Sequence, residues 1–416
     1  MLKNYLKITL AVMRRRKFYT FISLFGISLT LTVLIVITSF FDNLFAPNYP
    51  EVNRDRSLYI SRISQKDTVH NFNSSNDMSL YFIQKYISTL KTPEKVAIVG
   101  NSGINTYLNG QKAFIRIRYT DTHFWEVAAF DFLEGKPFND ETIKSSDNAL
   151  VLSSDTRDKY FGKDVPVVGK TAEIGNDIFH IVGVVRSCSL LQGHAVVGDV
   201  YMPYTADKSF GKNTSYTGRY SVIILAKNTG DLANIKEEFA ALLPKIPLQK
   251  DGDFTPHVIY LRPETAIGSF IYEIAGNDDS SGKPLFMTVI LGFALLFMSL
   301  PALNLVNVNI SRIMERASEI GIRKAFGASA NTLTLQFIIE NIILTVIGGV
   351  LALILSSIVI AYFNRVGIAD VPYMDLRINW LVASVAFLLS LVFGLLSGVY
   401  PAWRMAKLSV VEALKA

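Results

Sequence analysis

The 416-residue sequence contains a single cysteine, Cys188, which excludes a disulfide framework within one chain. Cys188 lies in a mixed apolar and polar stretch, as is typical of a small buried residue. The five histidines show no paired metal-ligand spacing, and the trio His180, Cys188 and His194 is too loosely spaced to indicate a metal site. The sequence also shows no nucleophile–base arrangement. It therefore predicts no catalytic centre, no metal site and no cofactor.

Charged residues are scarce in four long stretches of the chain. Half of all residues are hydrophobic and the mean hydropathy is +0.31, more positive than is usual for a soluble globular protein. Residues 18–42, 284–310, 334–363 and 378–400 can each span a bilayer, because about 20 apolar helical residues cover about 30 Å. The first stretch is too long for the apolar part of a signal peptide, and no A-x-A cleavage site follows it. We interpret it as a retained helix.

Two features inside these stretches have alternative interpretations. Glu340 lies near the start of the third stretch, where a helix N-terminus favours an anion. It is either a capped or interfacial carboxylate, or a contact to the charged segment that precedes it. Gly394 and Gly398 form a G-x-x-x-G pattern in the fourth stretch. The pattern permits close helix packing within the monomer, but it also arises by chance in glycine-rich helices.

Lysine and arginine residues are concentrated beside the apolar stretches. Residues 1–17, 311–330 and 402–416 hold thirteen of the 41 basic residues and three of the 35 acidic ones, so the remainder has an excess of four acidic residues although the net charge is +6. This is the positive-inside pattern of a membrane protein and does not indicate nucleic-acid binding. We expect a cytoplasmic amphipathic helix over 1–17, a cytoplasmic segment over 311–333 and a cytoplasmic tail over 401–416. Residues 43–283 and the short loop 364–377 then lie outside.

Residues 43–283 have the composition of a soluble domain with mixed helix and strand signals. The patterns predict helices over 78–90 and 231–243, a strand over 222–226 and a polar linker over 276–283. Hairpins are expected around Asn109-Gly110 and across 171–185. Ser153 or Ser154 is expected to cap a short helix that ends at Gly162. The domain is therefore predicted to be α+β.

One stretch of this domain nearly matches a nucleotide-binding motif. Residues 164–171 resemble the phosphate-binding pattern G-x-x-x-x-G-K-[ST], but Asp164 replaces the first glycine and Pro166 lies inside the loop. The residues that follow Lys170 look like a strand, whereas a phosphate loop leads into a helix N-terminus. An aspartate would also repel phosphates. We therefore expect this loop not to bind nucleotide.

The segment Ser311–Ala330 is strongly charged and lies between two apolar stretches. Its apolar residues recur at helical spacing, and Gly327 is suited to ending the helix. Any cytoplasmic loop carries basic residues, so the charges alone are weakly informative. The full string over 319–328, EIGIRKAFGA, is more specific. It closely resembles the coupling segment of FtsX-like, MacB-type ABC transporter permeases, and residues 132–138, 161–185 and 401–415 resemble the same family. Val410 stands where family members usually have proline.

The resemblance implies an α-helical membrane protein with four transmembrane helices and a large α+β extracytoplasmic domain inserted between helices 1 and 2. It also implies a non-catalytic subunit of the bacterial inner membrane, whose domain lies in the periplasm. Since no ATPase domain is fused to the sequence, a separate ABC ATPase is implied, together with a homo- or heterodimer of permease chains. By the resemblance, the ATPase-coupling residues are Glu319, Gly321, Arg323, Lys324 and Gly327.

Two functional classes fit this resemblance. The first is a permease that transmits ATP-driven motion to its periplasmic domain for export of a peptide, an antibiotic or a lipoprotein, with room for a periplasmic adaptor or an outer-membrane protein as a further partner. The second is an FtsX-like signalling or structural protein that regulates a periplasmic cell-wall enzyme. The large size of the domain over 43–283 favours the first class.

Overall fold

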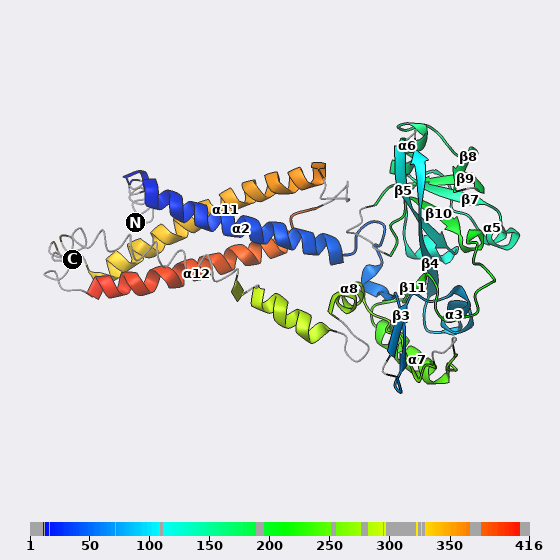
Figure 1. Cartoon of the computed structure of the whole chain (residues 1–416). Coiled ribbons are helices and arrows are strands. Elements are labelled where there is room, and N and C mark those ends of the chain that lie inside the picture. The colour runs from blue at the N-terminus through cyan, green and yellow to red at the C-terminus, as the bar shows by residue number, and fades with distance from the viewer. Residues whose placement is uncertain are drawn as a thin grey trace. The chain divides into compact units, whose positions relative to one another are not determined.

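The chain folds into two compact units, which are described separately below (Figure 1). One unit contains residues Asn43–Phe286, and the other contains Met1–Asp42 and Met287–Ala416. The computed structural model describes residues 11, 13–15, 17–70, 72–108, 111–175, 177–188, 195–250, 255–275, 282–293, 295–296, 322, 326, 329–366 and 376–407.

Long helices dominate the unit that contains both chain ends. They are α2 (Lys17–Phe45), α11 (Ala330–Val366) and α12 (Trp380–Lys407), and they run alongside one another (Figure 1). Among the described residues, the helices Lys17–Phe45 and Ile338–Val366 are long and apolar enough to cross a membrane, whereas Lys283–Phe293 and Trp380–Val392 are shorter apolar helical stretches. At 1.5 Å per residue, α2 extends about 44 Å, which exceeds the ~30 Å hydrocarbon core of a bilayer.

Adjacent glycines let α11 pack closely against both neighbouring helices. A Cβ atom added to Gly348 would lie 2.6 Å from Cγ2 of Ile27 in α2, and one added to Gly349 would lie 2.5 Å from Cε2 of Phe387 in α12. Ile27 is almost fully buried at this contact. The pair therefore sets the spacing of α11 from α2 on one side and from α12 on the other.

A nine-stranded sheet forms the centre of the other unit. Its strand order is β1-β11-β4-β5-β10-β7-β9-β6, with β8 paired to β9, and a three-stranded sheet has the order β12-β2-β3. The strands are β1 (Ser57–Ile60), β2 (Ile63–Asp67), β3 (Phe72–Asn76), β4 (Lys95–Leu108), β5 (Gln111–Thr120), β6 (Phe132–Gly135), β7 (Ala149–Ser153), β8 (Thr171–Ile174), β9 (Asp177–Val185), β10 (Val200–Pro203), β11 (Tyr220–Leu225) and β12 (Val258–Tyr260).

A hydrophobic core lies on each face of the large sheet. The helices of this unit are α3 (Leu80–Lys85), α4 (His123–Val127), α5 (Asp140–Ser145), α6 (Ser154–Phe161), α7 (Asp231–Leu242) and α8 (Ala266–Ala275). Residues of α3 and α7 pack in the core that contains Ile224 of β11, whereas α4 packs in the core that contains its neighbour Ile223. Every residue of β11 is consequently buried, which explains its largely apolar sequence; the hydroxyl of the buried Ser221 donates to the Val99 carbonyl.

Most local predictions for this unit are confirmed. The side chain of Ser153 accepts a hydrogen bond from the Thr156 amide at the start of α6, and Gly162, at φ 100°, follows its last residue. The strands of both predicted hairpins are present, and the helix expected over 231–243 is α7. The helix expected over 78–90 is shorter: α3 ends at Lys85, and only a 3-10 turn, Ile87–Thr89, continues it. The cap of Ser79 on the Phe82 amide fixes where α3 begins.

Helix α12 continues through Pro401 to Lys407, beyond residue 400, where the predicted fourth membrane span ends; the bounds of that span stay a prediction. One expectation about the long helices is wrong. Glu340 was interpreted through the helix N-terminus, but α11 begins at Ala330, ten residues earlier. The favourable effect of a helix N-terminus on an anion is confined to about the first turn, so it does not reach Glu340.

Candidate functional site

The proposed ATPase-coupling residues Glu319, Gly321, Arg323, Lys324 and Gly327 all lie outside the described residues. Gly394 and Gly398 lie within α12, where their spacing of four places them on one face of the helix. The described structure therefore informs the function through three other regions: the near match to a phosphate loop, the packing of the long helices, and a groove on the α+β unit.

The loop over 162–170 is a structural turn, and most of its backbone amides donate hydrogen bonds within the protein. The Val167 amide donates to a carboxylate oxygen of Glu134 at 2.9 Å, and the Gly169 amide donates to the Ile181 carbonyl at 2.9 Å. Lys170 is followed by strand β8, as the sequence predicted. A phosphate loop needs free amides and a helix at this point, so the described geometry does not match one.

Arg157 holds the acidic residues of this loop in place. Its guanidinium donates to Glu134 at 3.1 Å and to Asp164 at 2.9 Å, while Asp158 lies 2.7 Å away. Asp164 adopts a left-handed backbone conformation at φ 57°. The aspartate that replaces the first motif glycine thus takes part in an ion-pair cluster, where it would also repel a phosphate.

Replacing Lys170 with alanine is expected to leave ATP hydrolysis by the assembled complex unchanged. The Lys170 ammonium lies 5.7 Å from the centre of the Phe161 ring, a contact that contributes about 0.5–1 kcal/mol when exposed. The measurement is the ATP hydrolysis rate of the purified complex, with the melting temperature recorded in parallel. A stable Lys170→Ala protein that lost hydrolysis would show that the loop binds nucleotide after all.

Polar residues in the long helices have partners within or between those helices. The Thr32 hydroxyl donates to the Ser28 carbonyl of its own helix at 2.7 Å and lies 3.3 Å from the Ala352 carbonyl of α11. Asn379 donates to Asp42 at 2.9 Å. Glu340 is 2% exposed in α11. The Thr32 and Asn379 contacts stabilise helix association. Among the described residues, no group of three metal-ligating side chains is present.

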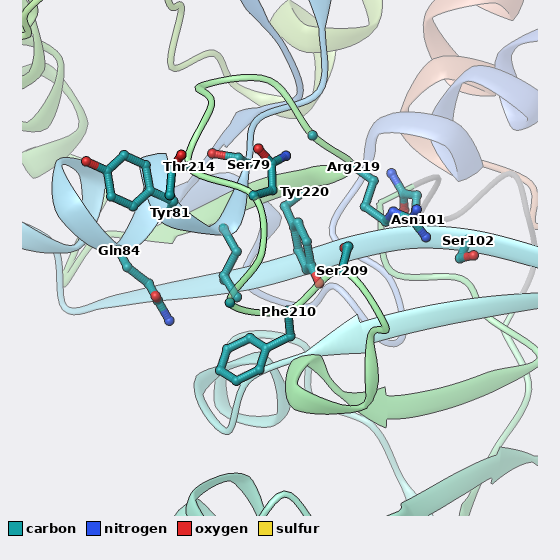
Figure 2. Close-up of a pocket in the computed structure, with 14 residues that line it drawn as sticks. Ser79, Tyr81, Gln84, Asn101, Ser102, Ser209, Phe210, Thr214, Arg219 and Tyr220 are labelled. Atoms are coloured by element: carbon teal, nitrogen blue, oxygen red, sulfur yellow. The ribbon is translucent and has the colours of Figure 1, made fainter. Parts of the chain in front are cut away.

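An open groove of about 690 Å³ crosses the α+β unit next to α3 (Figure 2). We call it the α3 groove. Figure 2 shows that its lining side chains come from α3 and its N-cap Ser79, from β4, from the loop that precedes β11 and from Tyr220 at the start of β11. Those labelled in Figure 2 are Ser79, Tyr81, Gln84, Asn101, Ser102, Ser209, Phe210, Thr214, Arg219 and Tyr220. A neighbouring depression of about 560 Å³ shares Ser102, Ser209 and Arg219 with it.

The α3 groove is lined by neutral hydrogen-bonding groups and by three aromatic side chains, of which Phe210 is exposed, Tyr81 partly buried and Tyr220 buried. Arg219 is the one charged side chain among its described lining residues, and its Nε lies 3.8 Å from a carboxylate oxygen of Asp207. The Tyr220 hydroxyl donates to the same carboxylate at 2.7 Å. Burial raises the pKa of Tyr220, and so does the bond to Asp207. This arrangement suits binding by hydrogen bonds, and it places no paired acid and base at the groove.

Sequence reasoning missed the α3 groove for a physical reason. Its residues come from three segments that are distant in sequence, and each segment alone looks like an ordinary polar turn or strand end.

Cys188, expected to be buried, is partly buried, and burial raises the pKa of its thiol to about 12. That shift suits an unreactive structural thiol.

Comparison with known proteins identifies the family. The model of the MacB-like periplasmic core domain matches residues 20–242, more than half of the chain, and the model of the FtsX-like permease C-terminal domain matches residues 291–410. The chain belongs to the MacB/FtsX-like family of ABC permeases. Its α+β unit is the region of the periplasmic core domain, and its membrane unit contains the FtsX-like domain.

Individual relatives of this MacB/FtsX-like permease are distant in sequence. The macrolide export ATP-binding/permease protein MacB of Escherichia coli O157:H7 is 26% identical over 346 residues, which cover 79% of this chain and 49% of that protein. MacB of Shigella boydii serotype 4 is 25% identical over the same coverage. The chain thus spans about half the length of the curated relatives it matches. The periplasmic region of MacB from Actinobacillus actinomycetemcomitans is 13% identical, covers 53% of this chain and 94% of that chain, and has a TM-score of 0.37.

Proposed function

We propose that this chain is the membrane subunit of an ABC transporter that transmits the ATP-driven motion of a separate ATPase to its periplasmic domain. The main support is the order of the two family matches, a periplasmic core domain over 20–242 followed by an FtsX-like permease domain over 291–410. Export of a peptide, an antibiotic or a lipoprotein is the proposed output. The chain itself is proposed to be non-catalytic, because its near match to a phosphate loop is occupied by structural contacts.

The proposed membrane arrangement has four transmembrane helices, over 18–42, 284–310, 334–363 and 378–400. The described helices α2, α11 and α12 overlap the spans over 18–42, 334–363 and 378–400, and the helix Lys283–Phe293 overlaps the start of the span over 284–310. Two permease chains, identical or different, would form the dimer in the inner membrane. A periplasmic adaptor or an outer-membrane protein would bind the outer domain.

In this proposal, Glu319, Gly321, Arg323, Lys324 and Gly327 contact the ATPase. The segment that carries them precedes α11, the helix that packs against both α2 and α12 through Gly348 and Gly349. Because close-packed elements shift as units, force applied before α11 would move all three helices together.

Affinity purification of the full chain in mild detergent tests the proposal. We expect an ABC ATPase to copurify and the complex to hydrolyse ATP. If an exported peptide or an outer-membrane partner accompanies it, export is supported; if a cell-wall hydrolase does, the FtsX-like regulatory role replaces it. Purification without any ATPase, and without stimulation of ATP hydrolysis by an added one, would contradict the proposal.

Cysteine labelling in intact cells is expected to place residues 43–283 outside and 311–333 inside. In a Cys188→Ser background, Lys212→Cys at an exposed position should react with a membrane-impermeant maleimide, whereas Ser318→Cys should react only after the inner membrane is permeabilised. The physical reason is that basic segments stay on the cytoplasmic side. Labelling of position 318 in intact cells would reverse the proposed topology.

A further inference from the structure

Arg54 lies where the last turn of α2 enters the α+β unit. It is 5% exposed, and its Nη1 donates to the carbonyl oxygens of Leu44 at 2.6 Å and Ala46 at 3.3 Å. The last carbonyl groups of a helix have no partners within the helix, and they attract a cation. Arg54 therefore holds the C-terminal end of α2.

Glu51 and Tyr59 hold Arg54 in turn. The Arg54 guanidinium donates to the Glu51 carboxylate, whose other oxygen accepts from the Tyr59 hydroxyl at 2.8 Å. Glu51 is 5% exposed and Tyr59 8%. Burial raises the pKa of Glu51 against the opposing charge of Arg54. In such an enclosed network the loss of one partner leaves another buried polar group without compensation.

The backbone of Tyr59 connects strand β1, through Glu264, to a second segment, the start of the helix Lys283–Phe293. Tyr59 lies in β1 and exchanges backbone hydrogen bonds of 2.7 and 3.1 Å with Glu264. The Glu264 carboxylate accepts from Lys283 at 2.7 Å and from Lys236 of α7 at 3.2 Å. Burial disfavours its charge, but these two lysines outweigh that cost and lower the pKa of Glu264. Lys283 begins the helix Lys283–Phe293, so the second segment is held to β1 as well.

Three aromatic rings connect the two segments directly. The ring centre of Phe270 in α8 lies 5.2 Å from that of Phe45, the last residue of α2, and 6.5 Å from that of Phe286 in the helix Lys283–Phe293. Both pairs have edge-to-face geometry, which is favourable for aromatic side chains. The ends of both segments thus share a polar contact to β1 and an apolar contact to α8.

We propose that five positioning residues couple two segments, the end of α2 and the start of the helix Lys283–Phe293, to the edge strand β1. These residues, which we call the junction, are Glu51, Arg54, Tyr59, Glu264 and Lys283. The proposal rests on the proposed function, because the junction would deliver the movement of the membrane helices to the outer domain. β1 pairs with β11 along its whole length, so a displacement of the junction would pass directly into the large sheet. Tyr59 is connected to both segments, to the first through its hydroxyl and Glu51 and to the second through its backbone and Glu264.

A substitution of Tyr59 with phenylalanine tests the junction without relying on ATP hydrolysis. The matched control is Tyr220→Phe, because Tyr220 is equally buried and its hydroxyl also donates to a buried carboxylate, that of Asp207. Amide hydrogen exchange of the purified full chain is measured at residues 43–46 and 282–286. We expect about five- to tenfold faster exchange at 43–46 in Tyr59→Phe and Arg54→Gln, because each removes a side-chain hydrogen bond of the first segment. The same acceleration is expected at 282–286 in Lys283→Met, which removes the contact to Glu264. Tyr220→Phe should leave both segments unchanged.

The second readout uses the full chain with its copurified ATPase. ATP and vanadate are expected to change amide exchange in β1 of the wild type. Tyr59→Phe should retain the bound ATPase and its hydrolysis but lose this change in β1, whereas Tyr220→Phe should keep it.

The two readouts separate failure of the junction from failure of the proposed function. Wild-type exchange at 43–46 in both Tyr59→Phe and Arg54→Gln, or at 282–286 in Lys283→Met, would overturn the junction, as would an equal acceleration of exchange in Tyr220→Phe. A wild-type protein that bound no ATPase and gave no response in β1 would instead overturn the proposed function, and the exchange comparison would still decide whether the junction holds the two segments.

Discussion

Replacement of Gly321 with tryptophan is expected to leave the protein inserted and dimeric but to prevent it from stimulating its ATPase. A glycine on a contact helix lets the partner approach closely, and an indole ring at that position would collide with the bound ATPase. We expect binding to weaken at least tenfold, which corresponds to about 1.4 kcal/mol. The measurements are retention of the ATPase on the purified permease and its rate of ATP hydrolysis.

Lys324→Ala is the milder comparison within the same segment. Exposed charge pairs contribute only about 0–1 kcal/mol, so this variant should reduce ATPase retention slightly. Gly327 would be sensitive for a different reason, because the positive φ of a helix end is unfavourable for a β-branched residue. If Gly321→Trp bound and stimulated the ATPase like the wild type, residues 319–328 would be no more than a basic membrane loop, and the ABC proposal would lose its main physical support.

The second large effect is expected at Gly348, where α11 packs closely against Ile27 of α2. An alanine there would place its Cβ 2.6 Å from Cγ2 and 3.0 Å from Cβ of Ile27, so the helices would have to move apart. Overpacking of this kind costs about 1–3 kcal/mol. We expect Gly348→Ala to lower the melting temperature in detergent and to reduce ATP hydrolysis by the complex.

Two further variants identify the cause. Gly292→Ala is the matched control, because no described atom outside its own neighbourhood lies within 4 Å of a Cβ at that position. It should melt at or above the wild-type temperature, since alanine favours helices over glycine by about 1 kcal/mol. Ile27→Ala removes the colliding Cγ2 atom, so the double variant should cost less than the sum of the two single changes. Strict additivity would mean that the two helices do not touch at this point.

Features determined by a few neighbouring residues could be predicted from the sequence. The cap of Ser153 on α6, the end of that helix at Gly162 and the strand after Lys170 all depend on interactions within four or five residues. The apolar stretches 18–42, 334–363 and 378–400 likewise gave the helices α2, α11 and α12, although the described helices extend beyond the predicted ends.

The junction and the α3 groove depend on pairings that no local pattern encodes. Tyr59 pairs with Glu264 across about two hundred residues, and Glu51 and Arg54 at spacing three look like an exposed helical ion pair until the fold buries them. Nothing in the sequence near Gly348 indicates that Ile27 is its neighbour. The choice of strand partners within the large sheet was similarly inaccessible, because each strand can pair with several others of equal apolar character.

The ends of the large sheet limit how another protein can bind it. Strand β1 has four residues, and its outer edge is already engaged by Glu264; the opposite border consists of β8 and β6, also four residues each, and β6 is interrupted by a bulge between Phe132 and Glu134. Short, bulged or covered borders prevent strand addition and edge-to-edge aggregation. These borders disfavour extension of the sheet by an incoming chain, so recognition here would depend mainly on side chains and loops, which can diverge between relatives while the sheet is maintained.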